Sequence, residues 1–173
     1  MNNLHLTNSL TNKKEIFNPI NKDKVSLYAC GPTVYDNPHV GNARALVVFD
    51  LLFRILVELY GKKKVIYVRN ITDIDDKIIE ASKIKKKDIS DLTKSVTEKF
   101  HSDCKILFCL NPTKEPRATD HVEGMINMTK KLIKKNAAYE KEGHVFFRVS
   151  AFKKYGELSN KNPDDLKAGA RVE

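Results

Sequence analysis

The sequence is poor in cysteine and lacks both long apolar runs and low-complexity segments. Its 173 residues include three cysteines, Cys30, Cys104 and Cys109. An odd number without framework spacing argues against a disulfide scaffold, so reduced thiols are expected. The apolar run at residues 45–49 stops at Asp50. This is far short of the roughly 20 residues of a membrane span, so we expect no membrane-spanning helix.

The amino terminus has no recognisable targeting signal. The first 17 residues, MNNLHLTNSLTNKKEIF, contain no apolar core of signal-peptide length and no small-residue cleavage site. We therefore expect a cytoplasmic protein. The hydrophobic fraction of 41% and the charged fraction of 31% are typical of a globular domain.

The net charge of +9 is the strongest compositional bias. A basic balance favours a polyanionic partner such as RNA. Lysine outnumbers arginine by 25 to 6, however, and enrichment in lysine, asparagine and isoleucine can follow from coding bias. The two explanations carry equal weight, and we interpret the lysine runs 62–64 and 85–87 as solvated faces.

The stretch 25–60 organises the rest of the chain. Residues 25–30 alternate like a strand and end at a Gly-Pro turn, and a helix is expected from about Gly41 to Tyr60. A β-branched run at residues 64–71 is typical of a second, parallel strand. The pattern predicts a β-α-β unit whose helix amino terminus can bind a nucleotide phosphate.

The helix at 41–60 has clear boundary signals. Asp36, Asn37 and Pro38 are expected to cap it, and Gly61 to stop it. The helix is apolar on nearly all faces, so we expect it to be buried against a sheet.

Other elements surround this unit. Three further helices and a small β element are expected, preceded by a short edge strand within the first 24 residues; the expected ranges are 73–84, 88–110 with a stop at Asn111-Pro112, 118–138, and 139–155 after a turn at Gly143. These elements together indicate an α/β protein.

Three groups of residues could carry chemistry. His39, Gly41 and Asn42 could bind a phosphate or merely cap a helix. Cys30 is, by its type and position alone, more typical of a small core residue than of a metal ligand. The carboxylates and hydroxyl of residues 72–76 could bind a ribose, an amine or Mg²⁺, or could serve only as helix caps.

Four segments together match a known family. They occur in order along the chain: LYACGPTVYDNPHVGNAR at 27–44, YVRNITDIDDKI at 67–78, EPRAT at 115–119 and GARVE at 169–173. They closely resemble the amino-terminal half of the catalytic domain of bacterial cysteinyl-tRNA synthetases. The resemblance implies the first half of a class I Rossmann-like fold, a parallel sheet with flanking helices, at residues 1–110. Residues 111–173 would contain the last helix of that half and the start of a small α+β connective insertion.

The resemblance also implies a reaction and its partners. Cysteine would be activated with ATP and Mg²⁺ and transferred to the tRNA for cysteine, with one zinc ion binding the substrate thiolate. A monomer is expected. Position by position, the implied roles are the metal ligand Cys30, the ATP-binding residues Pro32, Thr33, His39, Gly41 and Asn42, of which His39 and Asn42 are also catalytic, and the substrate-binding residues Gly31, Thr33 and Thr72.

Two departures from the family pattern matter. The last position of the first signature is usually histidine and here is Asn42, so a neutral donor replaces a potentially charged one. The other zinc ligands and the second signature loop are not found, which predicts an inactive fragment of a longer enzyme. The alternatives are a cysteine ligase acting on a small amine, a small nucleotidylyltransferase, and a non-catalytic nucleotide- or RNA-binding module.

Overall fold

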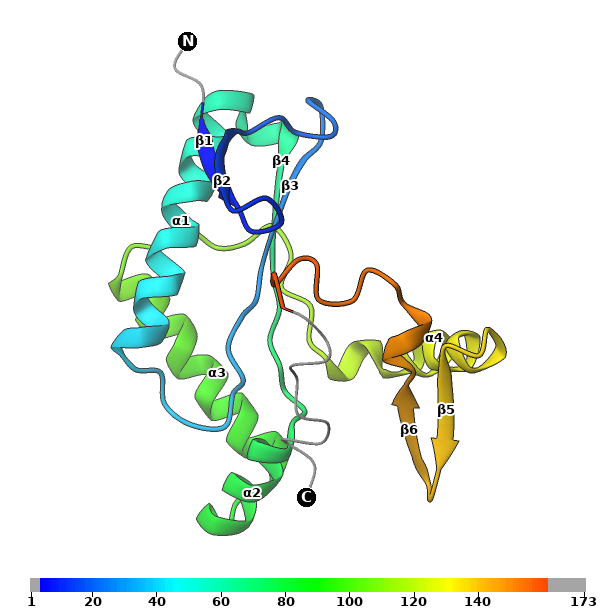
Figure 1. Ribbon diagram of the computed structural model, residues 1–173. Helices are drawn as coiled ribbons and strands as arrows, with labels where there is room; N and C mark the ends of the chain where they lie inside the picture. Colours follow the sequence, from blue (N-terminus) through cyan, green and yellow to red (C-terminus); the bar gives the residue numbers. More distant parts are fainter. Residues whose placement is uncertain (1–3, 162–173) are drawn as a thin grey trace. The chain divides into compact units, whose positions relative to one another are not determined.

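The computed structural model describes residues 4–161, which fall into two compact units (Figure 1). The larger unit comprises residues 19–123. The smaller unit combines residues 1–18 with 124–173, of which 4–18 and 124–161 are described. GARVE, the last of the four family-like segments, lies outside the described residues.

The larger unit contains the expected β-α-β arrangement. Strand β3, Val25–Ala29, leads through helix α1, Val40–Tyr60, and a 3₁₀ turn at Lys62–Lys64 into strand β4, Val65–Arg69. The two strands are parallel, in a register that pairs Val25 with Val65. The β4 residues Val65, Tyr67 and Arg69 alternate with less buried neighbours, as expected for a strand that covers a core with one face.

A third extended segment, which the sequence pattern did not predict, joins the opposite edge of β4. Parallel bridges connect Val68 to Lys114 and Ile71 to Arg117. The Arg69 N–H donates to the Lys114 carbonyl at 3.1 Å, and the Ile71 N–H to the Pro116 carbonyl at 2.9 Å. The EPRAT segment therefore runs beside the NITD segment, although the bridged residues are 46 positions apart along the chain.

Helices α2, Asp76–Lys85, and α3, Ile89–Ile106, complete the larger unit. Asp75 caps α2 and Asp88 caps α3 through their carboxylates. The core cluster takes its members from the loop after β3, from α1 to α3 and from the end of β4: Val34, Leu46, Ile71, Ile78, Leu92, Val96, Phe100 and Cys104. Because α3 supplies the last four, the apolar face of this amphipathic helix covers one side of the core.

The structure corrects the expected end of α3. The helix stops at Ile106, well before Asn111-Pro112. Phe108 has a φ of 54°, and its N–H donates to the Lys105 carbonyl. This left-handed residue, rather than the later proline, ends the helix.

Two expectations for α1 were also wrong. Its amino-terminal cap is His39, not residues 36–38. The helix is not buried on nearly all faces: Leu46, Phe53 and Leu56 are buried, whereas Val48 and Leu51 are each 58% exposed. The described strands lie against only one stripe of the helix. The expected stop was confirmed, since Gly61 has a φ of 87° and caps α1.

The smaller unit contains two hairpins and a helix. Strands β1, His5–Asn8, and β2, Lys13–Ile16, pair antiparallel where a single strand was expected. Helix α4, Val122–Lys134, is shorter than the expected range 118–138 and begins at the boundary with the larger unit. Strands β5, Ala138–Lys141, and β6, His144–Phe147, form a second hairpin around the expected turn at Gly143, followed by a 3₁₀ turn at Val149–Ala151.

Among residues 4–161, no helix is both long enough and apolar enough to cross a bilayer.

Candidate active site

The segments that follow β3 and β4 stay side by side beyond the strand ends, and they approach each other closely at Gly31 and Asn70. The Gly31 N–H donates to the Asn70 side-chain oxygen at 2.9 Å. A β-carbon at position 31 would lie 1.6 Å from the Asn70 carbonyl oxygen, inside any possible contact distance. Only glycine fits this junction, which brings the loop after β3 against the loop after β4.

Thr33 and Thr72 face each other just beyond this junction. They form a parallel bridge, in which the Thr72 N–H donates to the Pro32 carbonyl at 3.0 Å and the Val34 N–H to the Thr72 carbonyl at 3.1 Å. The Asn70 amide donates to the Thr72 hydroxyl at 3.1 Å. The three positions to which the resemblance assigns substrate binding, Gly31, Thr33 and Thr72, are therefore neighbours at the carboxyl ends of parallel strands, where ligands bind in open α/β sheets.

Two of the acidic residues after β4 have structural partners. Asp73 is 7% exposed and accepts hydrogen bonds from the Thr119 N–H at 3.0 Å and from the Thr119 hydroxyl at 2.7 Å. Asp75 accepts from the Lys77 N–H at 2.9 Å. Asp75 thus caps α2, whereas Asp73 holds the distant backbone at Thr119, which favours a structural role over Mg²⁺ binding for both carboxylates.

A reciprocal capping box closes the amino terminus of α1. The His39 Nδ1 accepts from the Gly41 N–H at 3.0 Å, and the Asn42 Oδ1 accepts from the His39 N–H at 3.0 Å. Because Nδ1 is an acceptor, the ring hydrogen is on Nε2 of this exposed imidazole, where it can donate to a ligand. Asn42 likewise offers its Nδ2 hydrogens.

This cap changes the expected mode of phosphate binding. The N–H groups of His39, Gly41 and Asn42 are all used within the cap, the last of them by the His39 carbonyl at 2.9 Å. Side-chain donors are therefore better placed than these amides to meet a phosphate. Gly41 leaves room for this position of the His39 ring, because a β-carbon there would approach the His39 Cε1 to 2.7 Å.

Cys30 and the helix-cap residue Asn42 line the same hollow. A hollow of about 80 Å³ is lined by Cys30, Gly31, Pro32 and Asn42, by apolar residues of α1, and by Tyr67, Arg69 and Phe100 from β4 and α3. Asn42 also lines neighbouring hollows of about 260 and 50 Å³, both of which include His39, and the smaller of which includes Thr33. Cys30 is exposed, which rules out the core role that its residue type suggested. Cys104 is buried and Cys109 partly buried.

The donor set for zinc is incomplete among the described residues. Within residues 4–161 no group of three or more His, Cys, Asp or Glu side chains is arranged to hold a metal ion. A thiolate is a suitable soft ligand, and zinc in proteins usually has four ligands. Cys30 can therefore supply one ligand only.

A buried ion pair beside the site was not predicted from the sequence. Arg69 is 3% exposed, and its Nε and Nη2 donate to Oε1 of Glu115 at 3.0 and 2.6 Å. The other Glu115 oxygen lies 2.6 Å from the His101 Nε2, and the guanidinium lies 4.8 Å from the Phe100 ring centre. Burial is the largest single influence on the pKa of Arg69 and works to lower it, but the hydrogen bond to Glu115 and the attraction of neighbouring acidic groups together leave that pKa raised. The only sequence signal for Glu115 was its position in the EPRAT segment, one of the segments that carry the family resemblance.

The same burial acts on Cys104, whose side chain lies near Arg69. Loss of hydration raises the pKa of the Cys104 thiol to about 11, in spite of the opposing effect of the guanidinium. The thiol is therefore protonated at neutral pH and unsuited to nucleophilic or metal chemistry.

Known proteins place the chain in a family. The family of tRNA synthetases class I (C) catalytic domains matches residues 16–173. A cysteine–tRNA ligase of Pelagibacter ubique is 55% identical over 98% of this chain and 38% of its own length. Those of Rickettsia prowazekii and Beijerinckia indica are 50% and 55% identical, again over 98% of this chain and 37% of their own lengths.

The chain thus spans less than two fifths of these relatives. The family match covers the whole site described above, from β3 to the EPRAT segment. The chain therefore belongs to the family of class I (C) tRNA synthetase catalytic domains.

Proposed function

We propose that this chain forms part of a cysteine–tRNA ligase. Cysteine would react with ATP to give cysteinyl-adenylate and pyrophosphate, and the cysteinyl group would pass to the tRNA for cysteine. The observation that carries the proposal is that Cys30 and Asn42 line one hollow at the carboxyl ends of β3 and β4. The relatives named as cysteine–tRNA ligases, with 50–55% identity, support it.

In this proposal the α1 cap stabilises charge on ATP. The cysteine carboxylate attacks the α-phosphorus, the bond to the β-phosphate oxygen breaks, and pyrophosphate leaves. His39 Nε2 and Asn42 Nδ2 donate hydrogen bonds to the phosphate oxygens, whose charge increases in the transition state. Both donors are neutral, so catalysis relies on positioning more than on proton transfer. Pro32, Thr33 and Gly41 complete the proposed ATP-binding loop.

The amino acid would bind next to the proposed ATP site, beside Gly31, Thr33 and Thr72. Cys30 would contribute one ligand to a zinc ion, which supplies selective binding of a thiolate over a hydroxyl. The hollows are smaller than the roughly 300–1,000 Å³ that encloses a drug-sized ligand. We propose that the additional length found in the relatives covers them and supplies the remaining ligands. The division near residue 110, a monomeric state and a cytoplasmic location stay predictions.

Cysteine-dependent exchange of pyrophosphate into ATP tests this function. The assay uses the protein extended to the length of its relatives. We expect exchange with cysteine and at least about 10⁴-fold less with serine, the discrimination reached by sites that bind one specific group. Equal exchange with both amino acids, or none in the folded protein, would contradict the proposal; transfer to a small amine instead of tRNA would correct its second half.

Replacing Gly41 with alanine tests the role of the cap. The new methyl group must displace the His39 ring, 2.7 Å away, and break the bond between Nδ1 and the Gly41 N–H. The lost cap costs about 1 kcal/mol, which the better helix propensity of alanine largely offsets. Stability should therefore change little, while the KM for ATP in the exchange assay should rise about tenfold, equivalent to about 1.4 kcal/mol. An unchanged KM for ATP would remove His39 from the ATP site.

A further inference from the structure

The side chain of Asn70 joins two residues of the proposed amino-acid site, Gly31 and Thr72. Its oxygen Oδ1 accepts from the Gly31 N–H at 2.9 Å, and its nitrogen Nδ2 donates to the Thr72 hydroxyl at 3.1 Å. A backbone N–H can only donate, so the amide atom that faces Gly31 must be the oxygen. The neighbours of Asn70 therefore fix which way its amide points.

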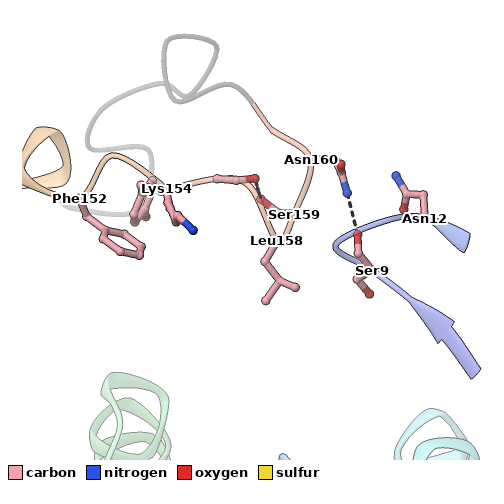
Figure 2. A pocket seen from close by; sticks show the side chains of 9 residues that line it. Ser9, Asn12, Phe152, Lys154, Leu158, Ser159 and Asn160 are labelled. Carbon is pink, nitrogen blue, oxygen red and sulfur yellow. Dashed lines mark hydrogen bonds between the residues drawn. The ribbon is translucent and has the colours of Figure 1, made fainter. Parts of the chain in front are cut away.

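Asn160 provides a contrast in the smaller unit. It lines a hollow of about 720 Å³ beside the β1–β2 turn (Figure 2). Its Nδ2 donates to the Ser9 carbonyl at 2.7 Å, and this is the only hydrogen bond of its side chain within the described residues. An exposed amide held at one end keeps rotational freedom, whereas the half-buried Asn70 is held at both ends. Asn70 can therefore set the direction of a further hydrogen bond.

The Asn70 amide determines how the Thr72 hydroxyl can act. Because Oγ1 of Thr72 accepts from Nδ2, the hydroxyl hydrogen is left to donate to a different group. The contacts of Thr72 within the described residues include no acceptor for this hydrogen. Its backbone groups are both used, since its N–H donates to the Pro32 carbonyl and its carbonyl accepts from the Val34 N–H. The hydroxyl hydrogen is therefore the donor that Thr72 can offer to a ligand.

The residues on both sides of Thr72 are buried and held in place. Ile71 is 1% exposed, and its carbonyl accepts from the Ala118 N–H at 3.0 Å. Asp73 is 7% exposed, and its carboxylate accepts from both the N–H and the hydroxyl of Thr119. A donor fixed in this way needs little reorganisation when a ligand binds, as expected for a group that holds a substrate in position.

The ligand group that meets this hydroxyl hydrogen must be an acceptor. In the proposed reaction the thiolate of cysteine binds zinc and its ammonium group can only donate, which leaves the carboxylate. We propose that Asn70 is a positioning residue, which directs the Thr72 hydroxyl to donate to one carboxylate oxygen of the amino acid. The other oxygen then stays free to attack the α-phosphorus of ATP. This inference rests on the proposed function and adds which end of the amino acid Thr72 binds.

Pyrophosphate exchange by Asn70→Asp, in the protein extended to the length of its relatives, tests this direction. The aspartate can still accept from the Gly31 N–H, but its second oxygen now accepts from the Thr72 hydroxyl and withdraws that hydrogen from the ligand. The KM for cysteine should rise at least about tenfold, as for a lost hydrogen bond to a charged group, and the KM for ATP should change less than about twofold. Asn111→Asp, at an exposed position outside the proposed sites, is the matched control and should change neither constant. An unchanged KM for cysteine in Asn70→Asp would overturn the proposal.

Cysteamine separates loss of the carboxylate contact from general damage to the site. It has the thiol and the amine of cysteine but no carboxylate, so it can inhibit exchange without being activated. Its inhibition constant should be unchanged or lower in Asn70→Asp, because it lacks the group that Thr72 binds. A structural defect would instead weaken cysteine and cysteamine alike, and that result would also overturn the proposal.

Variants at Thr72 separate the hydrogen bond from the charge added at position 70. Thr72→Ser keeps the hydroxyl and should keep the KM for cysteine, whereas Thr72→Val should raise it at least about tenfold. In the double variant, Asn70→Asp should raise this KM less than it does alone, because both residues act through one hydrogen bond. Effects that multiply fully would show that Asn70 acts independently of Thr72, against the proposal. Absence of cysteine-dependent exchange in the unsubstituted protein would refute the proposed function, whereas exchange that these variants leave unaffected would refute this inference alone.

Discussion

Replacing Gly31 with alanine should lower the free energy of unfolding by at least about 3 kcal/mol, the upper range for overpacking a core. The added carbon would lie 1.6 Å from the Asn70 carbonyl oxygen and 2.8 Å from its carbon, both backbone atoms of the neighbouring segment. Side-chain rotation cannot relieve such a clash. The segments after β3 and β4 must separate, which breaks the Thr33–Thr72 bridge. Urea denaturation followed by circular dichroism measures the loss.

Gly124→Ala is the matched control for this substitution. Gly124 lies in α4, and a β-carbon there would have no atom within 4 Å. Alanine should stabilise the helix by about 0.5 kcal/mol, because glycine loses more backbone entropy on folding. If both variants lost the same stability, the close approach at Gly31 would not be the cause.

Replacing Glu115 with glutamine should cost about 3–5 kcal/mol, the usual cost of leaving one buried charge without its partner. Glu115 accepts from two Arg69 nitrogens, and the third, Nη1, is buried without a hydrogen-bond partner among the described residues. Without the Glu115 charge, the guanidinium has no counterion in its 97%-buried position. The same denaturation experiment measures the cost.

Two further variants test this explanation. Asp103→Asn breaks the ion pair with Lys99, whose side chain is 54% exposed, and should cost less than about 1 kcal/mol. The double variant Arg69→Met/Glu115→Leu should be more stable than Glu115→Gln alone, because it removes the uncompensated charge. A double variant that is less stable would show that Arg69 contributes through packing and not through its charge.

The β-α-β unit could be predicted because its signals are local. Alternating residues in β3 and β4, the apolar helix between them and Gly61 after it depend only on near neighbours in sequence. Capping by His39 was only one of two alternatives for that residue, because histidine is a rare capping residue and the usual ones, Asp36 and Asn37, precede it. The partial exposure of α1 was missed, since periodicity reports apolar faces but not which of them find a partner.

The contacts that assemble the site join residues far apart in sequence. Arg69 and Glu115 are 46 residues apart, and Gly31 and Asn70 are 39 apart. No local pattern marks such pairs, so the third extended segment at 113–118 and the buried ion pair were not predicted. The family resemblance did bring together Gly31, Thr33 and Thr72. It also corrected the expectation for Cys30, which residue type alone assigned to the core.

The central claim is that Cys30 and His39 serve two adjacent sites, one for the amino acid and one for ATP. The most direct test is the KM for each substrate in pyrophosphate exchange, measured on the protein extended to the length of its relatives. Cys30→Ser should raise the KM for cysteine at least about tenfold, a loss of about 1.4 kcal/mol, and leave the KM for ATP unchanged. His39→Asn should do the reverse. Variants that shift both constants together, or a Cys30→Ser variant with an unchanged KM for cysteine, would contradict the account.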